Sequence, residues 1–171
     1  MTYNQYRSYS DKSLPEAKKH IANFIGADYL HESTFYDDTT NALDLYFEAP
    51  KIKVSHRSRK KEGDIKDITI KTKSKFDIPC EYDKLIQLAE SNKDPWYYFY
   101  CYYNETKNKI IRYIIYDLGK LIQSKEFQDK SIFEYSADKI NREDGGSHFN
   151  CITVQKLINM DLVRVNWSKI T

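Results

Sequence analysis

The sequence is poor in the residues that mark unusual classes of chain. It has 5 Gly and 4 Pro in 171 residues, which argues against a disordered or low-complexity protein. Its three cysteines, Cys80, Cys101 and Cys151, show neither zinc-site spacing nor a disulfide framework. No stretch approaches the roughly 18 apolar residues of a membrane span. We therefore expect a cytoplasmic protein with buried thiols and no membrane partner.

Aromatic and charged residues, by contrast, are abundant. Aromatics make up 15% of the chain and charged residues 30%, and the aromatic content favours β structure. A length of 171 residues predicts one domain. Residues 51–75 hold ten Lys or Arg and three acidic residues, a local charge of about +7 against +2 for the whole chain. This asymmetry indicates a surface for a polyanion, and the alternative is a solvated strand face.

The pattern of residues predicts the order of helices and strands. A polar arm is expected over residues 1–13, and a single α/β domain over 14–171. The run Ser13-Leu14-Pro15-Glu16 is typical of a helix start, and Gly26 is a candidate for the end of that helix. Three strands are then expected at residues 42–49, 51–59 and 67–73, with a hairpin loop at 60–66 between the second and the third.

The second half of the chain continues with a helix after Pro79. The run WYYFYCYYN (96–104) is apolar or aromatic on both faces, so we place it at the centre of a sheet. The other expected elements are a strand KIIRYIIYDL, a short helix 118–124, a loop-like region 125–147, a helix FNCITVQKLINM and a closing strand LVRVNW. The order predicts an α+β (mixed α/β) fold, in which helices flank a central mixed sheet.

Alternation along the second and third strands separates apolar from cationic residues. Ile52, Val54 and His56 alternate with polar and charged residues, so His56 is expected to face the core with Val54. The opposite face carries a row of cations, and cations in such a row can contact the phosphates of DNA or RNA. The predicted nucleic-acid-binding residues are Lys53, Arg57, Arg59, Lys71 and Lys73.

Acidic residues accompany this cationic face. The relevant runs are Asp37-Asp38-Thr-Thr-Asn-Ala-Leu-Asp44, Lys53-Val54-Ser55-His56-Arg57 and Asp67-Ile68-Thr69-Ile70. Together with the order of elements, they resemble the core of the restriction-endonuclease-like, or PD-(D/E)xK, superfamily, and a phage group of that fold in particular. Its core consists of a helix, a three-stranded meander, a second helix and a further strand. The resemblance covers about residues 14–104 and leaves 105–171 as peripheral additions.

The resemblance implies a metal-dependent nuclease of phage or mobile-element origin. Asp44 matches the motif aspartate, and Arg57 stands where the family has a catalytic lysine. Asp44 and Asp38 would hold Mg²⁺ or Mn²⁺ through carboxylate oxygens. Ser55 stands where the family has its second acid, so the motif is incomplete. A strict Asp-x-Lys triplet occurs only at Asp64-Ile65-Lys66, inside the expected hairpin loop.

The missing second acid keeps another class of function open. A protein of this fold without catalysis would bind nucleic acid, or would inhibit a host nucleic-acid-processing or defence complex, as anti-restriction and anti-CRISPR proteins do. An interaction domain unrelated to nucleic acid is the third alternative. Many proteins of this fold pair to cut two strands, so a homodimer is among the partners that the resemblance leaves open.

Overall fold

The computed structural model describes residues 3–26, 31–32, 45–48, 51–59, 65–74, 78–141 and 147–168. The helices are α1 (Tyr3–Ile25), α3 (Glu81–Ala89), α4 (Leu118–Gln123), α5 (Lys125–Gln128) and α6 (Val154–Asn159). The strands are β1 (His31–Glu32), β2 (Leu45–Glu48), β3 (Lys51–Arg59), β4 (Asp67–Lys73), β5 (Trp96–Asn104), β6 (Lys109–Asp117), β7 (Glu134–Asn141), β8 (Ser147–Thr153) and β9 (Val163–Ser168).

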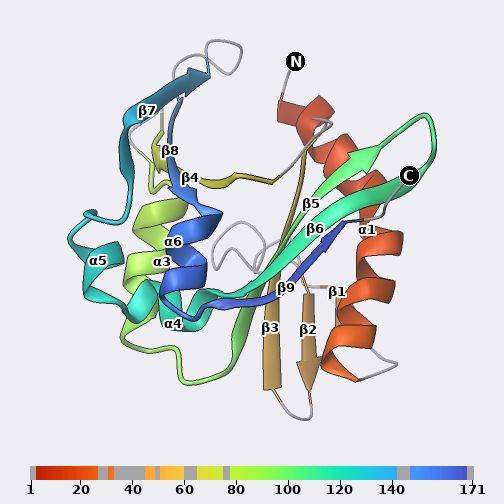
Figure 1. Ribbon diagram of the computed structural model, residues 1–171, viewed down its shortest axis with the longest axis horizontal. Coiled ribbons are helices and arrows are strands. Elements are labelled where there is room, and N and C mark those ends of the chain that lie inside the picture. The colour runs from red at the N-terminus through yellow and green to blue at the C-terminus, as the bar shows by residue number, and fades with distance from the viewer. Residues whose placement is uncertain are drawn as a thin grey trace.

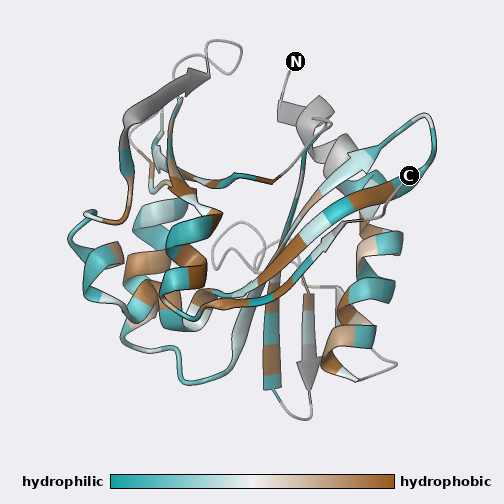
Figure 2. Ribbon diagram, in the orientation of Figure 1, coloured by the Kyte–Doolittle hydropathy of each residue, from teal (hydrophilic) through white to brown (hydrophobic). Residues whose placement is uncertain are grey.

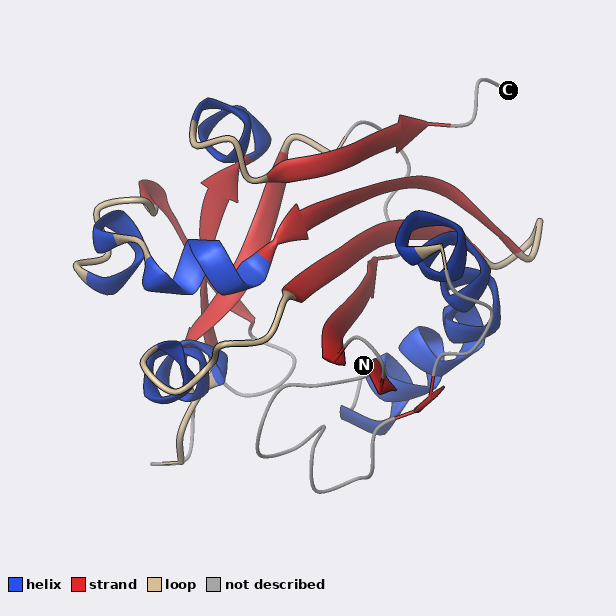
Figure 3. Cartoon of the chain, turned by 90° about the horizontal axis from the view of Figure 1, so that it is seen from below, coloured by secondary structure: helices blue, strands red, loops and turns tan. Residues whose placement is uncertain are grey.

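The described strands form two sheets. Six strands pair in the order β1-β2-β3-β5-β6-β9, and three pair in the order β4-β8-β7. In the large sheet β3 and β5 are parallel, whereas the other pairs are antiparallel. Helix α1 lies on one side of the large sheet, and α3, α4 and α6 lie on the other side with the small sheet (Figures 1 and 3). The predicted fold class, a mixed α/β protein with a central mixed sheet, is confirmed.

Strand β5 is central because both of its faces are buried. Phe99, Cys101 and Tyr103 pack toward α1, where Ala17 and Ile21 contact the sheet. The alternate residues of β5 face the other way. They join a second cluster with α3, α4 and α6, and this set consists of Trp96, Tyr98, Tyr100 and Tyr102. Burial on both faces explains why the strand has no polar face, as the sequence predicted.

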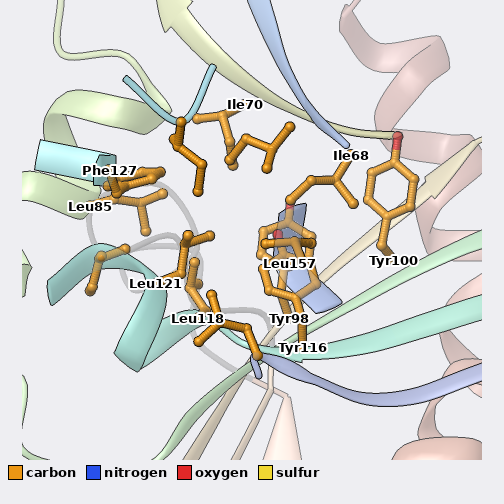
Figure 4. Close-up of a cluster of buried hydrophobic side chains, with 14 of the residues drawn as sticks. Ile68, Ile70, Leu85, Tyr98, Tyr100, Tyr116, Leu118, Leu121, Phe127 and Leu157 are labelled. Carbon is orange, nitrogen blue, oxygen red and sulfur yellow. The ribbon is translucent and has the colours of Figure 1, made fainter. Parts of the chain in front are cut away.

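The second core fills the space between the small sheet and the helices. This core includes Ile68 of β4, Leu85 of α3, Leu121 of α4 and Leu157 of α6, and all four are fully buried (Figure 4). Helix α1 is different, because hydrophilic and hydrophobic residues alternate along its described part (Figure 2). It therefore buries one stripe on the sheet and leaves the rest to solvent.

Helix α1 begins earlier than the sequence predicted. The expected polar arm over residues 1–13 is wrong for residues 3–13, which are helical, and Pro15 lies inside the helix. Tertiary contacts hold the turn before the proline: Ser13 is fully buried, and Lys12 forms an ion pair with Glu105 at 3.1 Å. The C-terminus is as expected, since Gly26 adopts φ +74°, which favours glycine, and its N–H donates to the Ala22 carbonyl.

Three other expectations are wrong. The predicted hairpin of β3 with β4 does not form, because β4 pairs antiparallel with β8 in the small sheet. Residues 147–153, expected partly as helix, form that partner strand, and the helix starts only at Val154. The region 125–147, expected as a loop, contains α5 and β7. The partner of β4 lies far away in the sequence, so local patterns carry little information about that pairing.

Candidate functional site

The cationic side chains of β3 lie beside aromatic side chains of β5 on the same face of the large sheet. The parallel register pairs Ser55 with Tyr98, Arg57 with Tyr100 and Arg59 with Tyr102. Paired residues point to the same face of a sheet, so the arginines share the face of the second hydrophobic core. That face is the one toward β4 and α3. The predicted alternation of charge therefore places cations at the seam between the two sheets.

Arg57 joins three elements at this seam. From β3, its Nη1 donates to the Thr69 carbonyl of β4 at 2.6 Å, and its Nη2 donates to Glu81 Oε2 at 2.7 Å. Glu81 is the first residue of α3, where a carboxylate also interacts favourably with the helix dipole. The same carboxylate accepts the Lys71 backbone N–H at 3.0 Å and the Tyr98 hydroxyl at 3.1 Å. Glu81 therefore binds three donors from β3, β4 and β5.

The Arg57–Glu81 pair also satisfies the backbone at the edge of the small sheet. Strand β4 is an edge strand, and successive backbone groups point alternately toward β8 and away from it. The Thr69 carbonyl and the Lys71 N–H belong to the alternate residues on the unpaired edge. Arg57 donates to the first and Glu81 accepts from the second. The ion pair thus takes the place of a neighbouring strand and blocks further pairing at this point.

Arg57 is a permanent cation in this position. Burial alone would lower the pKa of its guanidinium, but attraction to Glu81 outweighs burial and raises the pKa above its ordinary value. An arginine that never releases its proton cannot act as a general base. Its chemical use is therefore to bind an anion or to stabilise developing negative charge.

Two of the other predicted phosphate contacts, Arg59 and Lys53, have internal partners of different kinds. Arg59 donates to the Thr69 hydroxyl, lies 3.8 Å from an Asp67 carboxylate oxygen and sits over the Tyr100 ring at 5.3 Å. Lys53, nearer the start of β3, donates to Asn92 Oδ1 at 2.8 Å and stacks on Trp96. The side chain of Lys71 is partly buried, and that of Lys73 is exposed.

The structure therefore brings two of the five predicted cations together. Arg57 and Arg59 meet at the seam through Thr69, and Lys71 joins them only through its backbone N–H, which donates to Glu81. Lys53 belongs instead to the contact of β3 with the segment after α3, through Asn92. These contacts do not form a continuous row of free cations along the sheet.

The predicted metal ligands, Asp44 and Asp38, lie outside the described residues, as does Asp64 of the strict triplet. In the part of the chain that the structure describes, no group of three or more His, Cys, Asp or Glu side chains could hold a metal ion. The carboxylates of Glu81 and Asp67 pair with Arg57 and Arg59. The predicted metal site therefore depends on carboxylates outside the described residues, Asp44 and Asp38.

Two tyrosines beside this network have buried hydroxyls without a hydrogen-bond partner among the described residues. These are Tyr100 and Tyr116. Tyr116 stacks on Tyr98 with ring centroids 5.2 Å apart and an interplanar angle of 6°. Burial raises the pKa of both hydroxyls, which therefore remain protonated. Both rings contribute buried hydrophobic area to the second core.

We expect Tyr116→Phe to raise the free energy of unfolding by about 1 kcal/mol, because it removes a buried polar atom that has no partner. The matched control is Tyr98→Phe in the stacked neighbour. It should lower stability by about 1 kcal/mol, since the Tyr98 hydroxyl donates to Glu81. Urea denaturation curves measure both changes. Destabilisation by Tyr116→Phe would show that its hydroxyl does have a partner in solution.

His56 faces the opposite side of β3, as predicted from the alternation. It is 7% exposed and belongs to a polar cluster beneath α1. Its Nε2 lies 3.3 Å from Ser13 Oγ, 3.4 Å from Ser58 Oγ and 3.8 Å from Cys101 Sγ. Burial lowers the pKa of His56 to about 4 and raises the pKa of Cys101 to about 12. Both groups are therefore neutral at pH 7, and all three cysteines are buried, as expected.

Sequence reasoning missed Glu81, Thr69 and Tyr98 as members of the site. Glu81 lies 24 residues after Arg57, beyond a strand that belongs to another sheet. The one local signal is its place in the first helical turn after Pro79, where an acidic residue is common. That signal explains a helix start and gives no indication of an arginine partner.

No protein-family model matches the chain, and no curated protein is significantly similar to it in sequence. No helix among the described residues combines the length and apolar character needed to cross a membrane.

Proposed function

We propose that this protein is a nuclease-like protein that acts on the phosphodiester backbone of DNA or RNA. One observation carries the proposal, namely the pairing of the first strands. Helix α1 is followed by β1, β2 and β3, which pair antiparallel in that order, and α3 then leads to β5, which is parallel to β3. This is the order of elements in the restriction-endonuclease-like core, with β4 as an insertion. The observed order supports the resemblance with β1, β2 and β3 as the three-stranded meander. The sequence predicted the meander one strand later, at residues 42–49, 51–59 and 67–73.

In this proposal, Asp44 directly precedes β2 in the sequence, and Arg57 is the cation of β3. Leu45, the next residue after Asp44, pairs with Val54 of β3. Asp44 and Asp38 would hold a divalent cation, Mg²⁺ or Mn²⁺, which would supply the activation of water. Arg57 would stabilise negative charge on the phosphate, because it stays protonated. Origin in a phage or mobile element is part of the same proposal.

A second candidate function is binding without cleavage, and Ser55 favours it. The position where the superfamily has its second acid carries a hydroxyl, which accepts a hydrogen bond from the Trp96 indole at 3.0 Å. Glu81, the carboxylate beside Arg57, already accepts three hydrogen bonds. A protein of this kind would grip nucleic acid, or would inhibit a host nucleic-acid-processing or defence complex, alone or as a homodimer.

We expect Asp44→Ala to abolish metal-dependent cleavage, because it removes the motif carboxylate. Wild type and variant would be incubated with labelled single-stranded, duplex and branched DNA and RNA, in Mg²⁺, Mn²⁺ or EDTA. The matched control is Asp11→Ala, which changes an exposed aspartate of α1. Cleavage by wild type and control but not by Asp44→Ala supports the nuclease.

Other outcomes of the assay separate the candidates. Cleavage that survives Asp44→Ala would contradict the assignment and direct attention to Asp64-Ile65-Lys66. A salt-sensitive shift without cleavage would favour the binding function, since phosphate contacts weaken as counterions compete. If the assay shows neither cleavage nor a shift, nucleic acid is not the ligand, and a host protein becomes the partner to identify.

A further inference from the structure

We propose that Arg57 binds a phosphate of the nucleic acid. In the unbound protein the Glu81 carboxylate occupies the place beside Arg57 that the phosphate would take. Competition from Glu81 would therefore set the affinity for nucleic acid. The inference rests on the proposed function and deepens it. Arg57 Nη2 lies 2.7 Å from Glu81 Oε2, a distance typical of a charge-assisted hydrogen bond. A carboxylate and a phosphate present oxygens to a guanidinium in the same way. The two anions therefore compete for one cation.

The arrangement of donors allows Glu81 to release Arg57. If the guanidinium turns to a phosphate, the carboxylate still accepts the Lys71 N–H on Oε2 and the Tyr98 hydroxyl on Oε1. Glu81 is thus not left without partners, which is the situation that makes breaking an ion pair costly. Arg57 also has access to solvent, since 28% of its side chain is exposed.

The neighbouring arginine provides a second contact for the same anion. Arg59 follows Arg57 on the same face of β3, and both contact Thr69. Asp67 Oδ1 lies 3.8 Å from Arg59 Nη1, whereas Glu81 Oε2 lies 2.7 Å from Arg57 Nη2. A phosphate at Arg57 would therefore lie near a second guanidinium on the same face of β3.

The experiment compares Glu81→Gln with Glu90→Gln. Both changes remove one negative charge from α3 or its C-cap, but Glu90 is exposed and caps the far end of the helix. Glutamine keeps the shape of Glu81 and an oxygen that can accept from Lys71. Affinity for a labelled 20-nucleotide single strand and its duplex would be measured by fluorescence anisotropy in EDTA, over a series of KCl concentrations.

We expect Glu81→Gln to bind about threefold to tenfold more tightly than wild type. Its slope of log affinity against log salt should be steeper by about 0.7 to 0.9, the change for one added phosphate contact. Glu90→Gln should change affinity by less than about twofold, because a lone exposed charge is screened by salt. Adding Arg57→Gln to Glu81→Gln should remove the gain. Equal affinities and slopes for the two single variants would overturn the inference.

A second readout does not depend on nucleic acid. Phenylglyoxal modifies accessible arginines, and peptide mass spectrometry reports the extent at Arg57. We expect Arg57 to react several times faster in Glu81→Gln than in wild type or Glu90→Gln. Unchanged reactivity in a protein that binds nucleic acid would overturn the inference and leave the proposed function standing. Increased reactivity without any binding would overturn the proposed function, and the phosphate assignment with it.

Discussion

Replacing Arg57 by Met is expected to lower the free energy of unfolding by about 2 to 3 kcal/mol. The guanidinium from β3 donates to the Thr69 carbonyl of β4 and to the Glu81 carboxylate of α3. Methionine fills a similar volume but leaves both acceptors without this donor. Breaking a fully buried ion pair costs roughly 3 to 5 kcal/mol, and we expect less because 28% of the Arg57 side chain and 13% of Glu81 are exposed. Urea denaturation at pH 7 measures the change.

Two further variants identify the origin of the loss. Arg57→Met combined with Glu81→Gln should recover about 1 kcal/mol, since no carboxylate is then left without its cation. Lys12→Met removes the Lys12–Glu105 pair, whose side chains are 57% and 33% exposed, and should cost less than about 0.5 kcal/mol. If Arg57→Met were no more destabilising than Lys12→Met, the guanidinium would not be holding the two sheets together.

The elements that the sequence predicted well are those whose burial repeats locally. WYYFYCYYN is aromatic on both sides, and the strand lies between β3 and β6 with both faces covered. The residues of α3 carry their apolar side chains at helical spacing, so its burial against β4 follows from the pattern. Each prediction used a property of consecutive residues, and the tertiary structure did not oppose it.

Strand β4 shows what local patterns do not contain. DITIKTK alternates as a strand should, and the strand forms, but its partner is β8, whose paired residues lie about eighty positions later. The short segment between β3 and β4 made a hairpin the simplest expectation. The side chains of Arg57 and Glu81 satisfy the unpaired edge instead. A strand edge can be completed by side chains from distant residues, and no periodicity reports this.

The candidate site divides in the same way. The direction of His56 and of the arginines follows from alternation on β3, and the structure agrees. The internal partners of the arginines depend on how two sheets and a helix meet. The sequence therefore predicted a row of free cations, whereas the contacts show an interlayer network around Arg57. The roles of Asp44 and Asp38 stay predictions that the cleavage assay tests.

Acidification from pH 7 to pH 4 is expected to remove about 3 kcal/mol of stability through His56. Its folded-state pKa is lowered from 6.5 to about 4, because burial disfavours the imidazolium. In the unfolded chain the imidazole takes up its proton near pH 6.5, so below this pH the unfolded state binds more protons than the folded state. The stability that depends on a neutral His56 is fully present above pH 6.5. It is lost as the pH falls from 6.5 through the folded-state pKa of about 4. The interval of about 2.5 pH units, at ~1.4 kcal/mol per unit, gives the magnitude.

Comparison with His56→Gln isolates this term, because titrating carboxylates affect both proteins equally. The free energy of unfolding of the variant should fall less steeply between pH 6.5 and pH 4, and the two curves should converge by about 3 kcal/mol. Since protonated His56 would face Ser13, hydrogen exchange should increase first in the N-terminal half of α1. Equal slopes for wild type and His56→Gln would place the acid sensitivity outside the contact of α1 with β3.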